Sequence, residues 1–140
     1  MSEGPGKKKY DLGERTARFG EAIIRLAKKI PDVTANQPVI RQLVAAGTSV
    51  GANYCEADDA STDPDFCWKV GTCRKEASET KFWLRMVATS EPACKQEARE
   101  LWREASQLHL IFARIYRKMK RRLDEEEKRK RRKDEPGGEK

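Results

Sequence analysis

The sequence predicts an all-α protein, an antiparallel up-down-up-down four-helix bundle with a basic C-terminal extension. Apolar residues recur every three or four positions through four segments, and no segment shows the strict alternation of a half-buried strand. Loops of roughly two to six residues separate the segments, which favours antiparallel neighbours. A chain of 140 residues has room for one core. We therefore expect a bundle at 11–123, with a flexible lead at 1–10 and a charged tail at 124–140.

The first predicted helix runs from about Asp11 to Ile30. Asp11 and Glu14 form a D-x-x-E variant of the capping box, and Pro31 forces the residue before it away from helical dihedrals. Its apolar side consists of Leu12, Phe19, Ile23, Leu26, Ala27 and Ile30.

The second predicted helix runs from about Pro38 to Asp59. Pro38 fits the first turn because its missing N–H has no partner to lose there. The core side consists of Ile40, Leu43, Val44, Val50, Tyr54 and Ala57.

The third predicted helix opens on Asp63-Pro64-Asp65, with Asp63 as the expected N-cap, and ends near Ser90. Its core stripe is Phe66, Val70, Cys73, Ala77, Thr80, Leu84 and Val87. Three more aromatic residues lie beside this stripe: Trp68, Phe82 and Trp83. Because this apolar surface is wider than one neighbouring helix needs, we expect a homo-oligomer.

The fourth predicted helix begins near Pro92 and carries a heptad seam. Its core residues alternate spacings of four and three: Leu101, Ala105, Leu108, Phe112, Ile115 and Met119. After Leu123 the chain becomes a run of charges at 124–133, which can extend the helix through i,i+4 pairs of glutamate with lysine or arginine.

Small residues gather in the middle of the second helix, where Gly47 and Gly51 are i,i+4 neighbours. A glycine inside a helix costs about 1 kcal/mol relative to alanine, and close approach of another helix offsets that cost. Ser49, Asn53 and Glu56 place three polar groups on one stripe of the same helix. The stretch therefore predicts a close helix–helix crossing.

Carboxylates on the second and third helices suggest one alternative, because Glu56, Glu76 and Glu79 could face each other as in di-iron carboxylate bundles. Those sites also need Glu-x-x-His pairs, and the single histidine, His109, has no glutamate at that offset. We expect instead a buried polar network in which Glu56 pairs with Asn53, Ser49 or Lys75 and fixes helix register. The protein is predicted not to be an enzyme.

Four cysteines lack the spacing of a zinc site, since Cys55, Cys67, Cys73 and Cys94 contain no C-x-x-C pair. We expect buried free thiols, no metal, no cofactor and no small-molecule substrate. The opening residues contain no apolar run, and no segment approaches the ~20 apolar residues that cross a bilayer. These features predict a cytoplasmic protein with no membrane partner.

Basic residues concentrate near the C-terminus. The net charge is +7, and residues 117–140 hold 12 basic and 7 acidic side chains, or +5 of that total. Arg114, Arg117, Lys118 and Arg121 form one stripe about 10 Å long at a rise of ~1.5 Å per residue. The predicted nucleic-acid-binding set is Arg114, Arg117, Lys118, Lys120, Arg121, Arg122, Lys128, Arg129, Lys130, Arg131 and Arg132. No aromatic residue follows Tyr116, so this set predicts phosphate contacts without base stacking in the tail.

Two ordered blocks resemble the bacterial four-helix-bundle proteins called 23S rRNA intervening-sequence proteins. The first block is Gln42-Leu43, Gly47 to Tyr54 and Glu56-Ala57, and the second is Asp65-Phe66 and Lys75 to Thr80, leading into Trp83-Leu84. The resemblance covers about 10–87 and implies a homopentamer with its bundles arranged as a tapered barrel. A distantly similar protein, the accessory variability protein of diversity-generating retroelements, binds reverse transcriptase and RNA through a basic barrel surface.

This chain departs from the family pattern at two places. Many relatives carry Arg-Ser where this chain has Ala45-Ala46, and the basic extension after Leu123 is longer than the family leads one to expect. Two functions remain open. The first is an oligomer that binds RNA or an RNA-bound protein, and the second is an oligomeric protein scaffold or adaptor with no nucleic-acid role.

Overall fold

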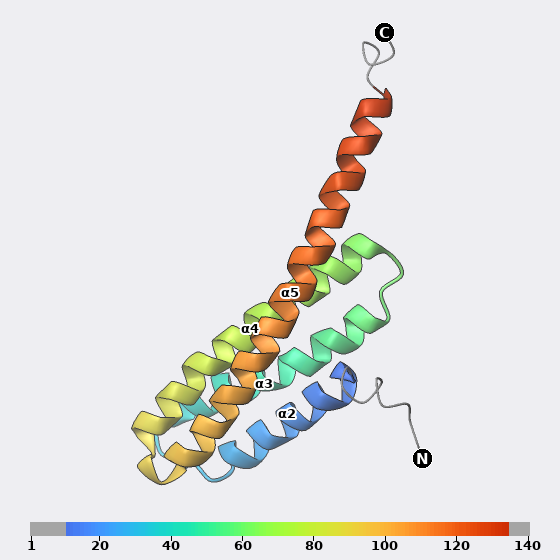
Figure 1. Ribbon diagram of the computed structural model, residues 1–140. Coiled ribbons are helices and arrows are strands. Elements are labelled where there is room, and N and C mark those ends of the chain that lie inside the picture. Colours follow the sequence, from blue (N-terminus) through green and yellow to red (C-terminus); the bar gives the residue numbers. More distant parts are fainter. Residues whose placement is uncertain (1–10, 135–140) are drawn as a thin grey trace.

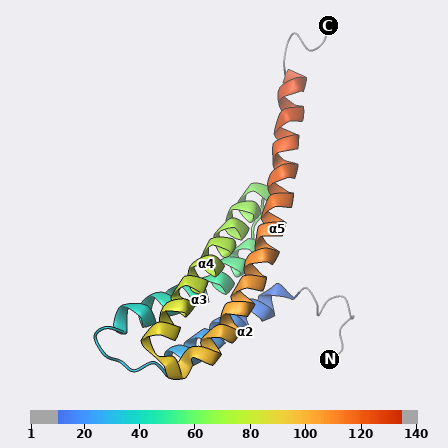
Figure 2. The ribbon, with the colours of Figure 1, turned by 60° about the vertical axis from the view of Figure 1, so that its left-hand side comes forward.

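The computed structural model describes residues 11–134, so the expected flexible lead at 1–10 and the end of the chain at 135–140 lie outside the described residues. The described part contains four α-helices and no strand: α2 (Leu12–Ala27), α3 (Gln37–Asp58), α4 (Asp63–Ser90) and α5 (Lys95–Asp134), with a short 3-10 turn, η1 (Pro92–Cys94), before α5. Figures 1 and 2 show the four helices packed side by side and the last turns of α5 projecting beyond the others. The predicted all-α four-helix bundle is confirmed.

The helix starts follow the capping chemistry of the sequence, with one correction. The Asp11 carboxylate accepts a hydrogen bond from the Glu14 N–H at 3.0 Å, as predicted. The N-cap of α4 is Thr62 and not Asp63, because the extended Thr62 backbone lets its hydroxyl accept from the Asp65 N–H at 3.2 Å. Asp63 is instead the first helical residue, where its charge is still favourable against the helix dipole.

The core follows the predicted stripes. All six apolar residues proposed for the first helix are buried, including Ile30 in the turn after α2. On α5, Ala105, Leu108 and Phe112 are fully buried, whereas the flanking seam residues Leu101, Ile115 and Met119 are half-buried. None of the described helices combines the length and the hydropathy that crossing a membrane requires.

The small residues of α3 lie against α2, which confirms the predicted close crossing. A Cβ on Gly47 would lie 2.8 Å from two carbons of the fully buried Ile23 side chain. A Cβ on Gly51 would lie 3.2 Å from the backbone oxygen of Thr16. A side chain at Gly47 would therefore force Ile23 to move, and one at Gly51 would press on the backbone of α2, so both glycines favour the close approach of α2 and α3.

The outer side of α4 leaves large apolar side chains in solvent. Trp68 is 69% exposed and Phe82 is 51% exposed, while Trp83 is half-buried and packs edge-on against Phe82 with 4.9 Å between ring centroids. Exposed aromatic rings of this size are unusual on a monomer unless they contact a partner. Trp68 and Phe82 lie 14 positions apart on the helix, or about 21 Å, so they belong to two separate patches of the surface.

Candidate nucleic-acid interface

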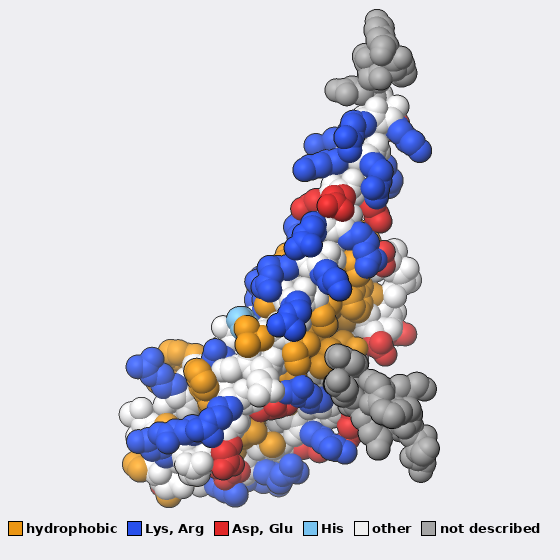
Figure 3. All heavy atoms as spheres, viewed as in Figure 1, with side chains coloured by type: hydrophobic (Ala, Val, Ile, Leu, Met, Phe, Trp, Pro, Cys, Tyr) orange, Lys and Arg blue, Asp and Glu red, His pale blue; other side chains and the backbone are white. Residues whose placement is uncertain are grey.

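The predicted nucleic-acid-binding residues all lie on α5, and every one of them is exposed. Leu108 and Phe112 hold the helix in the core, so the opposite side of α5 is turned outward at Arg114, Arg117 and Arg121. Figure 3 shows lysine and arginine side chains covering this side of α5 and continuing along its projecting end. The fold thus places all the predicted cations on the exposed sides of a single helix.

Helix α5 continues beyond the last residue that packs against the bundle. Leu123, half-buried beside Pro64 of α4, is the last apolar residue of α5, yet the helix continues to Asp134. Each residue of the acidic run 124–127 has a basic residue four positions later, which is the favourable orientation for i,i+4 pairs. Glu127 and Arg131 come within 3.6 Å, and Arg131, Arg132 and Lys133 lie in the last turn, where cations suit the helix dipole.

The basic surface has two parts separated by an acidic collar at 124–127. Four consecutive carboxylates point around the whole circumference of a helix, and Figure 3 shows them as a red band between two blue regions of α5. Residues 124–140 contain seven basic and seven acidic side chains and are neutral overall. The net positive charge of the C-terminal region therefore comes from the nearer part, at 117–122.

Further cations lie along the seam between α4 and α5, and the sequence-based set did not include them. The Arg74 guanidinium lies over the ring of Tyr116, 5.0 Å from its centroid, and the Lys81 ammonium lies 4.6 Å from that of Trp102. Burial, followed by the charges of Lys81 and Arg74, lowers the pKa of His109, which is therefore neutral at pH 7. Only the antiparallel register of α4 and α5 brings these residues together, so local sequence spacing could not reveal the cluster.

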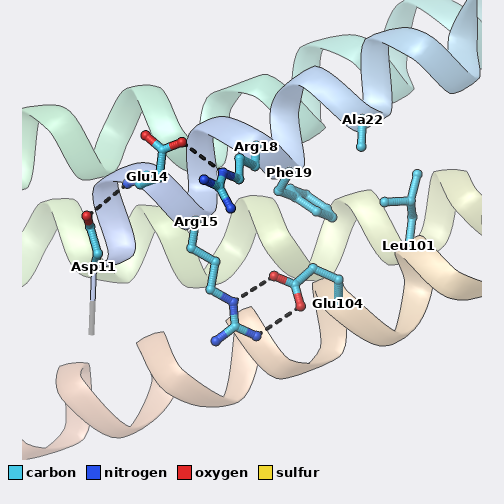
Figure 4. Close-up of a pocket in the computed structure, with 8 residues that line it drawn as sticks. All are labelled: Asp11, Glu14, Arg15, Arg18, Phe19, Ala22, Leu101 and Glu104. Carbon is cyan, nitrogen blue, oxygen red and sulfur yellow. Dashed lines mark hydrogen bonds and ion pairs between the residues drawn. The ribbon is translucent and has the colours of Figure 1, made fainter. Parts of the chain in front are cut away.

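A cleft of about 860 Å³ opens between α2 and α5, but its charges are already paired (Figure 4). The Arg15 guanidinium donates to both carboxylate oxygens of Glu104, at 2.7 and 2.9 Å, and also to Gln107 at 2.9 Å. Arg18 pairs with Glu14 at 2.8 Å. α2 packs mainly against α3, so these pairs bridge the wider gap to α5. The arrangement is structural, since its cations have carboxylate partners.

The polar stripe of α3 does not form the predicted buried network. Ser49 donates to the backbone oxygen of Ala45 at 2.6 Å, and Asn53 donates to that of Ser49 at 2.9 Å, so both bonds stay within the helix. Glu56 is exposed and forms an ion pair with Lys69 of α4. The predicted partners of Glu56 were wrong because Lys69, on the neighbouring helix, reaches its carboxylate first.

The two glutamates of α4 have different surroundings. Glu76 is half-buried, and burial, followed by the charge of Glu79, raises the pKa of its carboxyl. Glu79 is exposed and accepts a hydrogen bond from the Trp83 indole N–H at 3.1 Å. Among residues 11–134, no three histidine, cysteine or acidic side chains are grouped as metal ligands would be.

Three of the four thiols are buried, as predicted, but Cys55 is exposed on α3. The prediction for Cys55 was wrong because the position lies beside the core stripe of α3 and not on it. Burial raises the pKa of the Cys73 thiol to about 12, so this sulfur is protonated at neutral pH and is not a ready nucleophile.

Comparison with known proteins confirms the resemblance seen in the sequence. The pattern of the 23S rRNA-intervening sequence protein matches residues 8–114, and so ends before the projecting part of α5. A crystal structure of a protein of unknown function from the S23 ribosomal protein family of Bacteroides thetaiotaomicron VPI-5482 is similar at 25% identity and a TM-score of 0.68. The similarity covers 75% of this chain and 97% of that one. No curated protein matches the chain. Because the matched residues include most of the bundle, the chain belongs to the 23S rRNA-intervening sequence protein family.

Proposed function

We propose that this protein is an oligomer that binds RNA through the phosphate backbone, using the cationic surface of α5. The observation that carries the proposal is the continuous helix from the core to Asp134, along which the cations of 114–122 and 128–133 are exposed. A rigid cationic rod of this kind meets successive phosphates without reading bases, so sequence preference is weak. The family, whose name refers to ribosomal RNA, favours RNA over DNA as the polymer.

Removing residues after Leu123 tests the contribution of the projecting helix. Residues 124–134, the part of this segment that the structure describes, contribute no side chain to the core, so the truncated protein should keep its helical bundle and its oligomeric mass. We expect affinity for a single-stranded RNA to fall on the order of tenfold at about 100 mM salt, because a run of six cations is lost with its counterion release. Fluorescence anisotropy measures the affinity, and circular dichroism with light scattering provides the folding control.

Two results would contradict the proposal in different ways. A truncated protein that binds as tightly as the full chain would move the RNA site to the bundle. If the full-length protein binds no RNA at low salt, the proposed RNA binding is wrong and the protein-scaffold alternative is favoured.

The scaffold alternative is supported by a different observation, the exposed Phe82 packed edge-on against Trp83 in the last third of α4. An aromatic pair of this kind suits contact with a second copy of the chain, and it is compatible with RNA binding on α5. We therefore place the oligomer contact on this part of α4 and the RNA on α5.

Light scattering checks the oligomer. We expect a mass of about 80 kDa, five copies of the 16.0 kDa chain, at micromolar concentration. A Phe82→Arg variant should have a lower mass, because a charge at the contact would have to be desolvated. A mass near that of one chain for the parent protein would exclude the oligomer.

A further inference from the structure

A shallow notch of about 230 Å³ lies where the basic surface of α5 meets the start of α4. Trp68, Thr72 and Lys75 contribute from α4, and Tyr116, Lys120 and Leu123 contribute from α5. Its lining contains three cations, Arg74, Lys75 and Lys120, and no acidic residue. The notch is therefore apolar in part and positive at its rim.

The Tyr116 ring forms a fixed wall of this notch. Arg74 covers the ring at 5.0 Å from the centroid, and Gly71 packs so closely that a Cβ there would lie 2.9 Å from a ring carbon. The face under Arg74 is therefore occupied, and the ring cannot turn to receive a ligand.

Trp68 is the free aromatic surface of the notch. It is 69% exposed, the largest exposed fraction among the large apolar side chains of the described residues. Lys120, on the other side of the notch, approaches Asp124 only at 3.8 Å, and both side chains are more than half exposed. A pair so long and so exposed contributes little, so a phosphate can take the place of Asp124.

We propose that this notch holds one unpaired nucleotide of RNA, with its base stacked on Trp68 and its phosphate between Lys75 and Lys120. The proposal rests on the proposed function and names the part of the surface that contacts a base. An exposed ring flanked by cations is the combination by which proteins hold single strands, and stacking accepts any base. The notch is continuous with the cations of 117–122, so a strand that leaves it runs directly onto α5.

A pair of oligonucleotides separates stacking from charge. The probes are a fluorescein-labelled oligouridylate and an abasic oligomer of the same length, which has the same phosphates and no bases. We expect Trp68→Ala to weaken binding of the oligouridylate roughly tenfold and to leave binding of the abasic oligomer unchanged. Trp68→Phe, which keeps a ring, should restore most of the loss.

Trp102→Ala is the matched control. Trp102 is also exposed, at 41%, and also lies next to a cation, Lys81, but it is 18 positions from Lys120 on α5, or about 27 Å. We expect this variant to bind both oligomers as the parent does. Substituting either exposed tryptophan should have little effect on folding.

The outcomes distinguish this proposal from the proposed function. If the parent binds neither oligomer at low salt, both proposals fail. If Trp68→Ala binds the oligouridylate as tightly as the parent does, the stacking site is wrong and RNA binding through α5 stands. An equal loss on both oligomers, with a lower mass by light scattering, would identify Trp68 as a contact between protein chains and overturn the site. If Trp102→Ala weakens oligouridylate binding as much as Trp68→Ala does, the loss is not specific to the notch and the stacking site at Trp68 is overturned.

Discussion

Replacing Gly51 with leucine is expected to lower the free energy of unfolding by about 1–3 kcal/mol or more, although leucine is the better helix former. A Cβ at this position would lie 3.2 Å from the backbone oxygen of Thr16 and 3.3 Å from its hydroxyl oxygen, which is tighter than an ordinary contact, and a leucine side chain extends further from that Cβ. The contact atom is backbone, so relief requires the two helices to move apart. Urea denaturation followed by circular dichroism measures the change.

Ala45→Leu is the matched control for this substitution. Ala45 lies on the same helix but is exposed, so the added atoms meet solvent and the stability should change by no more than ~0.5 kcal/mol. A Gly51→Leu protein as stable as the Ala45→Leu protein would show that the α2–α3 crossing can widen at little cost.

Most of the fold could be predicted because its determinants are local. Asp11 caps α2 through a residue three positions away, and the heptad seam of α5 needs only its own spacing. The one displaced cap has a local cause as well, since both Thr62 and Asp63 are capping residues and the backbone conformation decides between them. Gly47 and Gly51 indicated a close crossing, and only the structure could identify Ile23 and Thr16 as the residues of α2 that pack against them.

The candidate interface could be predicted only in part. Exposure of the cations on α5 follows from the polarity of the sequence after Tyr116. The notch at Trp68 could not be predicted, because the antiparallel register of two helices decides that Lys120 and the start of α4 line the same notch. The predicted pairing of Glu56 with Asn53, Ser49 or Lys75 was wrong for the same reason, since the register of α3 and α4 brings Lys69 to its carboxylate.

The acidic collar gives the two basic parts of α5 different roles. The far part, 128–133, is balanced by the carboxylates of 124–127 on its own helix, and these pairs support a helix that has no core contact. The near part, 117–122, holds five cations and no carboxylate of its own, its one ion pair with the collar is the long Lys120–Asp124 contact at 3.8 Å, and it lies beside the notch at Lys120. We therefore expect the near part to contribute most of the attraction for phosphates, and the far part to add contacts once a strand is bound.

Changing Arg117, Lys118, Arg121 and Arg122 to glutamine should weaken binding of a single-stranded RNA by roughly a hundredfold or more at about 100 mM salt. Each lost phosphate contact also lowers the slope of log K against log salt by ~0.7 on a single strand, so four contacts reduce that slope by nearly 3. All four residues are exposed, so the bundle should remain folded. Anisotropy titrations at several salt concentrations measure both quantities.

A second variant separates the local surface from the overall charge of the protein. Four exposed cations elsewhere on the bundle, changed to glutamine, remove the same net charge: Arg25, Lys28, Arg41 and Lys95. Because exposed charges beyond the Debye length of ~10 Å are largely screened at this ionic strength, we expect only a small loss of affinity and an almost unchanged slope. Equal losses in the two variants would mean that RNA responds to net charge alone, and α5 would then lose its assignment as the binding surface.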